Sequence, residues 1–195
     1  MSTPEQHTYT TSKTDSDLSG IIDLQKSNLA QNLTKTEMQR QGFLTVAHSL
    51  STLKKMQAQE RNIIIKDQNK IIGYLLAMTK KSRLDIPILI PMFEIFDKVQ
   101  YNGKLVSEYN YIVVGQVCIN KNNRGKGLLN NCYEIYKNYF KNKYDFAITE
   151  IATTNKRSIN AHKRIGFEEI YKFKDFNSTE WSIVIWDWNS INKNT

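Results

Sequence analysis

The sequence predicts a single α+β domain in which helices pack on a mixed, mostly antiparallel β-sheet. Two β-rich runs, residues 61–66 and 70–79, flank the short turn Asp67-Gln68-Asn69 and predict an antiparallel hairpin. A strand, helix and strand follow one another over residues 109–152 and predict a right-handed parallel unit. Two further β-rich runs, residues 168–176 and 180–188, predict a final pair of strands.

Length and composition are those of one globular domain. The chain has 195 residues, of which 40% are hydrophobic and 24% charged. No apolar run approaches the roughly 20 residues of a membrane helix, and the polar start contains no apolar signal region. We therefore expect a cytoplasmic protein with a disordered start over residues 1–6, one domain over residues 7–190 and a tail over residues 191–195.

Polar capping residues predict three helices before the hairpin, after an edge strand over residues 7–13. The second of these helices should end at Gly42, because glycine commonly terminates a helix. The expected capping residues are Thr14 or Ser16, Thr34, and Ser49 or Ser51.

Residues 80–108 form a connection too long to lack structure in a compact domain. Pro91 suits the first position of a helix, and the pair Asn102-Gly103 is a stop signal after that helix. We therefore predict a helix in this segment.

The two cysteines, Cys118 and Cys132, lie in a predicted strand and a predicted helix without C-x-x-C spacing. Two reduced, buried thiols are the expectation, and no metal site is indicated.

The formal net charge of +8 predicts a polyanionic ligand without specifying it. Nucleic acid is one such ligand. The basic residues, however, are spread from Lys54 to Lys193, and no aromatic-basic recognition motif is present. Both observations argue against nucleic acid.

The turn between the predicted strand and helix at residues 109–140 contains two glycines and two cations, in the order Arg124-Gly125-Lys126-Gly127. Glycine permits backbone conformations in which several N–H groups at a helix start converge on one anion. The spacing excludes the P-loop, and Asn130 stands where the dinucleotide-binding motif requires its last glycine.

This turn resembles the pyrophosphate-binding turn of the GNAT superfamily of acyl-CoA N-acyltransferases, with a departure at Leu129. A second stretch is similar to the family's fifth strand and the helix after it. The residues in register there are Glu150, Asn155, Ser158, His162, Arg164, Gly166 and Phe167. The resemblance implies a domain of αβα layers, in which the fourth and fifth strands are parallel and splayed around acyl-CoA.

Acetyl-CoA is the cosubstrate that the resemblance implies, with no metal. Its expected contacts are Val117, Cys118, Ile119, Arg124, Gly125, Lys126, Gly127, Leu128, Leu129, Asn155 and Ser158.

Catalysis requires a base, because an alkyl amine is almost wholly protonated at neutral pH. Glu150 matches the strand glutamate that some family members use. His162 stands where the family commonly has a proton-donating tyrosine, and donor and structural roles both stay open. Glu94, Asp97 and Glu108 are candidate contacts for a cationic acceptor.

We therefore expect an N-acetyltransferase that transfers an acetyl group to the primary amine of a small molecule. The amine would attack the acetyl thioester directly, through a tetrahedral intermediate. A small acceptor is preferred because residues 80–108 would fill part of a groove that a peptide needs. The alternative acceptor is a protein N-terminus or lysine, and the rival from another class is a non-catalytic nucleic-acid-binding protein. A homodimer is left open.

Overall fold

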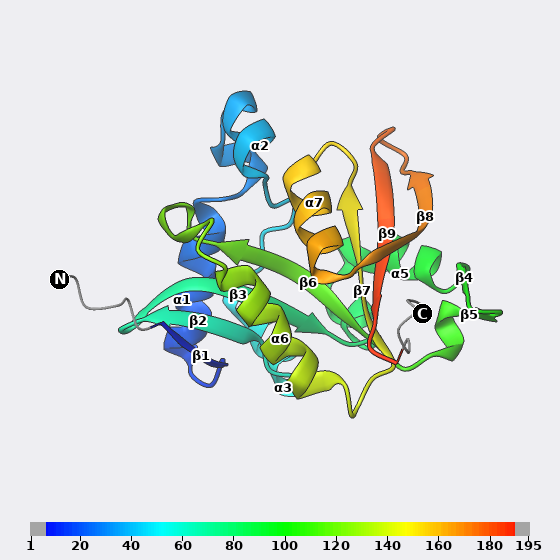
Figure 1. Ribbon diagram of the computed structural model, residues 1–195, viewed down its shortest axis with the longest axis horizontal. Coiled ribbons are helices and arrows are strands. Elements are labelled where there is room, and N and C mark those ends of the chain that lie inside the picture. The colour runs from blue at the N-terminus through cyan, green and yellow to red at the C-terminus, as the bar shows by residue number, and fades with distance from the viewer. Residues whose placement is uncertain (1–6, 190–195) are drawn as a thin grey trace, which may run out of the picture.

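A seven-stranded sheet forms the middle layer of the protein (Figure 1). The computed structural model describes residues 7–189, so the expectations for residues 1–6 and 191–195 lie outside the described residues. The strand order is β1-β2-β3-β6-β7-β9-β8, and β6 and β7 are its parallel pair. The strands are β1 (Thr8–Thr11), β2 (Ile63–Asp67), β3 (Lys70–Met78), β6 (Tyr111–Ile119), β7 (Phe146–Ala152), β8 (Glu168–Lys174) and β9 (Glu180–Asp187).

Helices cover both faces of the sheet, and each face buries its own apolar cluster. Leu18 of α1, Leu53 of α3 and Phe93 of α5 belong to the cluster on the first face. Tyr133 of α6 and the partly buried Ile159 of α7 belong to the cluster on the second face. The helices are α1 (Asp15–Lys26), α2 (Lys35–Gln41), α3 (Leu50–Gln59), α4 (Ser82–Asp85), α5 (Ile90–Phe96), α6 (Leu128–Phe140) and α7 (Lys156–Ile165).

The expected αβα layers, hairpin and parallel unit are thus confirmed, as are three of the capping residues. Thr14, Thr34 and Ser49 each accept a hydrogen bond from a backbone N–H in the first turn of the helix that follows. Both cysteines are buried and free, as expected. Short 3₁₀ turns complete the chain: η1 (Ala30–Asn32), η2 (Pro87–Leu89), η3 (Val106–Glu108) and η4 (Lys121–Asn123).

Asn102 and Gly103 differ from their expected role as a helix stop. Helix α5 ends earlier, at Phe96, and the two residues form the turn of a small hairpin between β4 (Gln100–Tyr101) and β5 (Lys104–Leu105). Their φ angles of 46° and 80° explain the difference, because a tight hairpin turn requires two consecutive residues with positive φ.

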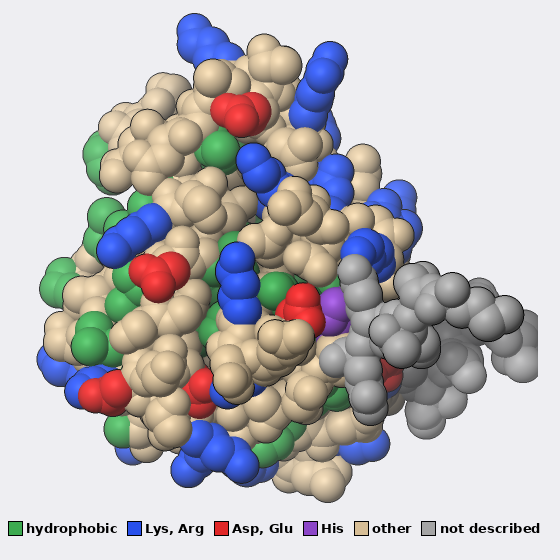
Figure 2. All heavy atoms as spheres, turned by 90° about the vertical axis from the view of Figure 1, so that its left-hand side faces the viewer, with side chains coloured by type: hydrophobic (Ala, Val, Ile, Leu, Met, Phe, Trp, Pro, Cys, Tyr) green, Lys and Arg blue, Asp and Glu red, His purple; other side chains and the backbone are tan. Residues whose placement is uncertain are grey.

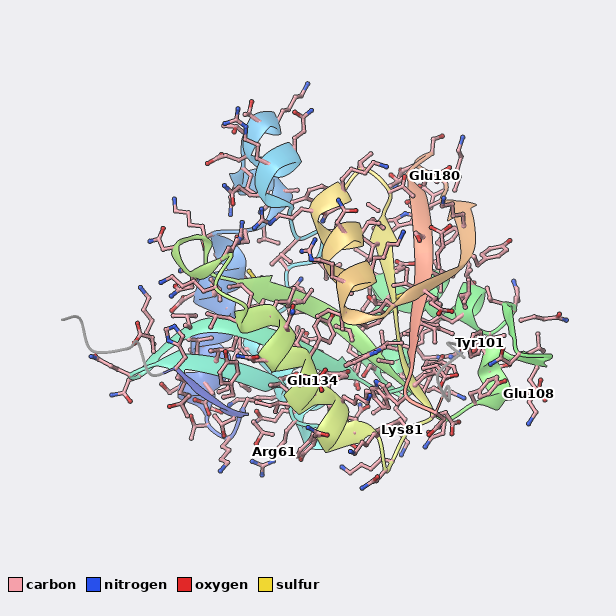
Figure 3. The ribbon with its side chains drawn as sticks, in the orientation of Figure 1. Arg61, Lys81, Tyr101, Glu108, Glu134 and Glu180 are labelled. Atoms are coloured by element: carbon pink, nitrogen blue, oxygen red, sulfur yellow. The ribbon has the colours of Figure 1, made fainter. Side chains whose placement is uncertain are left out.

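Residues 80–108 pack at the end of the sheet where β6 and β7 begin. Phe93 and Phe96 make an edge-to-face pair, and Phe96 makes another with Tyr111, the first residue of β6. Figure 3 shows the two ends of the sheet. Glu108, in the 80–108 segment, lies beside β4 and β5, and Glu180, the first residue of β9, lies near the opposite end. The segment therefore extends the core at the closed end of the β6–β7 pair.

Strands β6 and β7 stay together over three residue pairs. Their last pair is Val113 with Ile148, after which β6 continues along β3 and β7 continues along β9. The register between β3 and β6 shifts at this point, so that Gly115 is the extra, unpaired residue of a bulge. Because a bulge bends its strand, the bulge at Gly115 directs β6 away from β7 and opens a slot in the sheet.

Gly115 also packs closely against Met78 of β3. A Cβ atom at residue 115 would lie 2.7–2.8 Å from the Cε, Cγ and Sδ atoms of Met78. We expect Gly115→Ala to lower the free energy of unfolding by about 1–3 kcal/mol through overpacking. Combined with Met78→Ala, it should cost less than the sum of the two single changes, as measured by urea unfolding. Strictly additive costs would show that the contact with Met78 is not the reason for glycine.

Candidate active site

A glycine turn leads into helix α6 and forms the predicted anion cradle. Gly125 and Gly127 have φ angles of 81° and 76°, and Gly127 is the N-cap of α6. No side chain caps this helix start, and a Cβ atom on either glycine would meet nothing within 4 Å. The first N–H groups of the helix and its dipole therefore favour an anion at this position.

The cradle borders a cavity of about 360 Å³ between α2, α6 and α7. All of the predicted coenzyme-contact residues except Lys126 line this cavity. Arg157 and Arg164 of α7 line it too and add positive charge. Figure 2 shows that basic side chains outnumber acidic ones over the upper part of the face on which α2 lies. The cavity thus combines backbone donors with cations, which fits a polyanionic ligand.

Arg124, one of the expected coenzyme contacts, lines this cavity, and its side chain is hydrogen-bonded to other parts of the protein. Its Nε donates to the carbonyl oxygen of Ile119 at 2.8 Å. Nη1 donates to the carbonyl and side-chain oxygens of Gln41, at 3.0 and 2.7 Å. Nη2 donates to Oδ1 of Asn28 at 2.6 Å. These hydrogen bonds therefore join the turn to the end of β6, to the last residue of α2 and to Asn28, which precedes α2 in the chain.

A second, smaller cavity of about 100 Å³ lies where the slot in the sheet opens. Gly115 of β6 and Glu150 of β7 line its two sides, and Trp181 of β9 lines it as well. It adjoins the larger cavity through the residues that line both, which are Phe43, Leu44, Val117, Asn155, Ser158 and His162. A ligand on the cradle can therefore reach the second cavity through the slot.

Thr149 fixes the closed end of this slot. Its hydroxyl donates to the carbonyl oxygen of Val114 at 2.9 Å, one residue beyond the last backbone pair of β6 and β7. The slot therefore starts at a defined depth in the sheet.

Glu150 lines the second cavity and has a buried carboxylate oxygen. Its Oε2 atom is buried, and no described residue hydrogen-bonds to that atom. Burial, together with the negative charge of Asp175, raises the pKa of Glu150 to about 7. A carboxyl group with this pKa exchanges a proton readily near neutral pH, which general base catalysis requires.

His162 is buried, and both of its ring nitrogens have partners. Nδ1 lies 2.9 Å from the carbonyl oxygen of Ser158, so it carries the proton and donates it. Nε2 lies 2.7 Å from the hydroxyl of Tyr133 and accepts its hydrogen bond. Burial lowers the pKa of His162 to about 4, against a smaller opposite effect of the Ser158 carbonyl. This geometry favours the structural role for His162.

The three carboxylates expected to contact the acceptor line neither cavity. Asp97 forms an ion pair with Arg83 at 2.7 Å, and Glu108 accepts a hydrogen bond from the backbone of Leu105. Glu94 is exposed on α5. They are not near the slot, because residues 80–108 pack at its closed end. No residue of 80–108 lines either cavity, so the structure gives no support to the expectation that this segment fills the groove.

Gln116 is a cavity residue that the sequence analysis did not identify. Its Oε1 accepts a hydrogen bond from the hydroxyl of Tyr74, and its Nε2 donates to the carbonyl oxygen of Val46 at 2.8 Å. A glutamine within an apolar strand was the available signal. Phe43 and Trp181 carry no comparable signal, because their position depends on how distant segments meet.

Solved structures of several N-acetyltransferases share this architecture. The ribosomal-protein-S18-alanine N-acetyltransferase from Escherichia coli superposes with a TM-score of 0.62 at 11% identity, covering 97% of this chain and 99% of that one. NAA60 from Arabidopsis thaliana in complex with acetyl-CoA gives 0.65 at 10% identity, covering 94% and 99%. A spermidine N-acetyltransferase chimera from Vibrio cholerae gives 0.56 at 15% identity, covering 93% and 95%.

No protein-family model and no curated protein matches the sequence. The structural likeness nevertheless confirms, at the level of the fold, the resemblance to the GNAT superfamily: the chain has the GNAT fold. Among residues 7–189, no helix is long and apolar enough to cross a membrane, and no group of His, Cys, Asp and Glu is arranged to hold a metal ion.

Glu150→Gln should change how stability depends on pH. Between about pH 4.5 and 7 the folded protein keeps a proton on Glu150 that the unfolded chain has released, so the wild type loses stability as pH rises through this range. Glutamine does not titrate. We expect the stability of the variant relative to wild type to increase by about 2 kcal/mol from pH 4.5 to pH 8.

Urea unfolding at both pH values measures this difference. His48 and His162, whose pKa values burial lowers to about 4, also titrate in the acidic range. They are present in both proteins, so their contribution cancels in the comparison. A constant difference between variant and wild type would show that the pKa of Glu150 is not raised.

Proposed function

We propose that this protein is an acetyl-CoA-dependent N-acetyltransferase that acts on a primary amine. The observation that carries the proposal is the carboxyl group of Glu150, whose pKa of about 7 suits it to take a proton. It lies at the slot that joins the anion cradle to the second cavity, which we call the acceptor cavity. The GNAT fold of the chain and the acetyltransferase activity named for its structural neighbours support the same reaction.

Two parts of the chain fit coenzyme A. The backbone N–H groups around Gly125 and Gly127 suit its pyrophosphate, with positive charge from Arg157 and Arg164 beside them. Residues 117–119 of β6 pair with β3 but not with β7. Their backbone groups on the slot side suit the amides of the pantetheine arm. When bound, the acetyl thioester supplies an activated acyl carbon at the slot.

Glu150 would act on the acceptor from the opposite side. It takes a proton from the protonated amine, directly or through a water molecule, and so makes the nitrogen nucleophilic. The proton on the departing thiolate comes from solvent, because His162 shares its own proton with the Ser158 carbonyl.

The second cavity favours a cationic acceptor with a slender end. A volume of about 100 Å³ accommodates the end of an amine-bearing chain, and Trp181 offers an aromatic wall. Asp175, held by Nε1 of Trp181 at 3.0 Å, adds negative charge near Glu150. We propose a small-molecule amine as the acceptor. A protein N-terminus or lysine is the second candidate, because residues 80–108 line neither cavity, one structural neighbour is named as a ribosomal-protein-S18-alanine N-acetyltransferase and another, the NatC complex, is described with a bound peptide.

Acetyl-CoA at about 100 times its dissociation constant should raise the melting temperature by about 5 °C, since a ligand of the native state stabilises it by mass action. Gly127→Glu should abolish this shift by placing bulk and negative charge at the cradle. Gly103→Glu is the matched control, because Gly103 also has a positive φ and an open Cβ position but lies in the distant β4–β5 turn. An equal shift in both folded variants would remove the cradle from the proposal.

Glu150→Gln should lower turnover by about 100-fold at pH 7 while the affinity for acetyl-CoA stays the same, since only the base is removed. The deficit should shrink at higher pH, where more acceptor is already unprotonated. Release of free thiol reports turnover over a panel of polyamines, aminoglycosides, amino acids and peptides. Intact-protein mass spectrometry tests protein acceptors. Equal turnover of variant and wild type would exclude Glu150 as the base.

A further inference from the structure

Residues 42–48, which we call the strap, lie across the open end of the slot. Nδ2 of Asn155, next to β7, donates to the carbonyl oxygen of Phe43 at 3.1 Å. Nε2 of Gln116, on β6, donates to the carbonyl oxygen of Val46 at 2.8 Å. The strap is thus hydrogen-bonded to both sides of the slot. Its residues 43–46 line the acceptor cavity.

The strap is attached to the segment that follows α1 by a short parallel bridge between Leu29 and Leu44. The N–H of Leu44 donates to the carbonyl oxygen of Asn28 at 2.9 Å. The N–H of Ala30 donates to the carbonyl oxygen of Leu44, also at 2.9 Å. Helix α2, which leads into the strap, has no buried side chain. Leu44 and Val46 of the strap pack, partly buried, against the apolar cluster on the first face, so this packing and the hydrogen bonds together determine where the strap lies.

Arg124 binds two residues that hold the strap in place, Gln41 and Asn28. Its Nη1 holds Gln41, the last residue of α2 before the strap, and its Nη2 holds the side chain of Asn28, whose backbone carries the bridge to Leu44. Its Nε holds the end of β6 at Ile119. The same residue immediately precedes Gly125, so one guanidinium links the strap to the cradle.

We infer that Arg124 is a positioning residue that holds the strap over the acceptor cavity and couples its order to anion binding at the cradle. An anion on the N–H groups of the turn fixes the backbone that carries Arg124. The fixed guanidinium in turn fixes Gln41 and Asn28. Coenzyme binding should therefore reduce strap motion, and acceptor binding should benefit from it. The effect on the acceptor rests on the proposed function, whereas the effect on the strap does not.

Arg124→Lys tests the inference, because lysine keeps the charge but not the planar fork that reaches three partners. Backbone hydrogen exchange of residues 42–48, measured by mass spectrometry, should become at least tenfold faster. Coenzyme A should slow this exchange in the wild type and not in the variant. By calorimetry the affinity for coenzyme A should change less than threefold, while the KM for the acceptor should rise at least tenfold with a smaller change in kcat.

A further variant guards against misfolding. Gln41→Ala removes one partner at an exposed position and should speed strap exchange in the same direction, to a smaller extent.

Opposite results would overturn the inference. If Arg124→Lys weakens coenzyme A binding tenfold and leaves strap exchange unchanged, Arg124 is a phosphate ligand. If Gln41→Ala leaves the hydrogen exchange of the strap unchanged, the positioning role of Arg124 is rejected, even if Arg124→Lys fails to fold. Because hydrogen exchange and coenzyme A binding need no turnover, an absence of acetyl transfer would reject the proposed function and leave the positioning role standing.

Discussion

The separation of β6 from β7 is the constraint on which the rest of the site depends. Two parallel strands normally continue their hydrogen bonds, yet here the pairing ends at Val113 and Ile148, where Gly115 bulges. The separation leaves backbone groups of β6 unpaired on one side and exposes the end of β7 on the other. Glycine suits this point because the side chain of Met78 occupies the space that a Cβ atom would fill and would have to move for a larger residue.

The slot separates two electrostatic environments that a single open cleft would mix. On one side, helix N–H groups and arginines favour phosphate. On the other, burial and the charge of Asp175 raise the pKa of Glu150 to about 7, so its ionised form near neutral pH can accept a proton from a cationic ligand. Because the two cavities adjoin through shared lining residues, a polyanion and a cation can be held near each other in a protein of net positive charge.

Local sequence chemistry predicted much of this structure. The capping residues Thr14, Thr34 and Ser49 act within one helical turn, so their neighbours in the chain are sufficient to identify them. The cradle glycines are also a local signal, since a positive φ is a property of one residue. Asn102 and Gly103 were misassigned because the same pair can end a helix or turn a hairpin, and the pairing of β4 with β5 decides between them.

By itself, the sequence determined the GNAT resemblance, the glycine cradle and the presence of a carboxylate and a histidine at positions 150 and 162. Tertiary structure alone decided the surroundings of those side chains. Arg124 binds Gln41 and Asn28, which are 83 and 96 residues away in the chain. The pKa of Glu150 rises because burial penalises its charge, and the proton of His162 is held by Ser158. Both depend on packing between segments that no local pattern specifies.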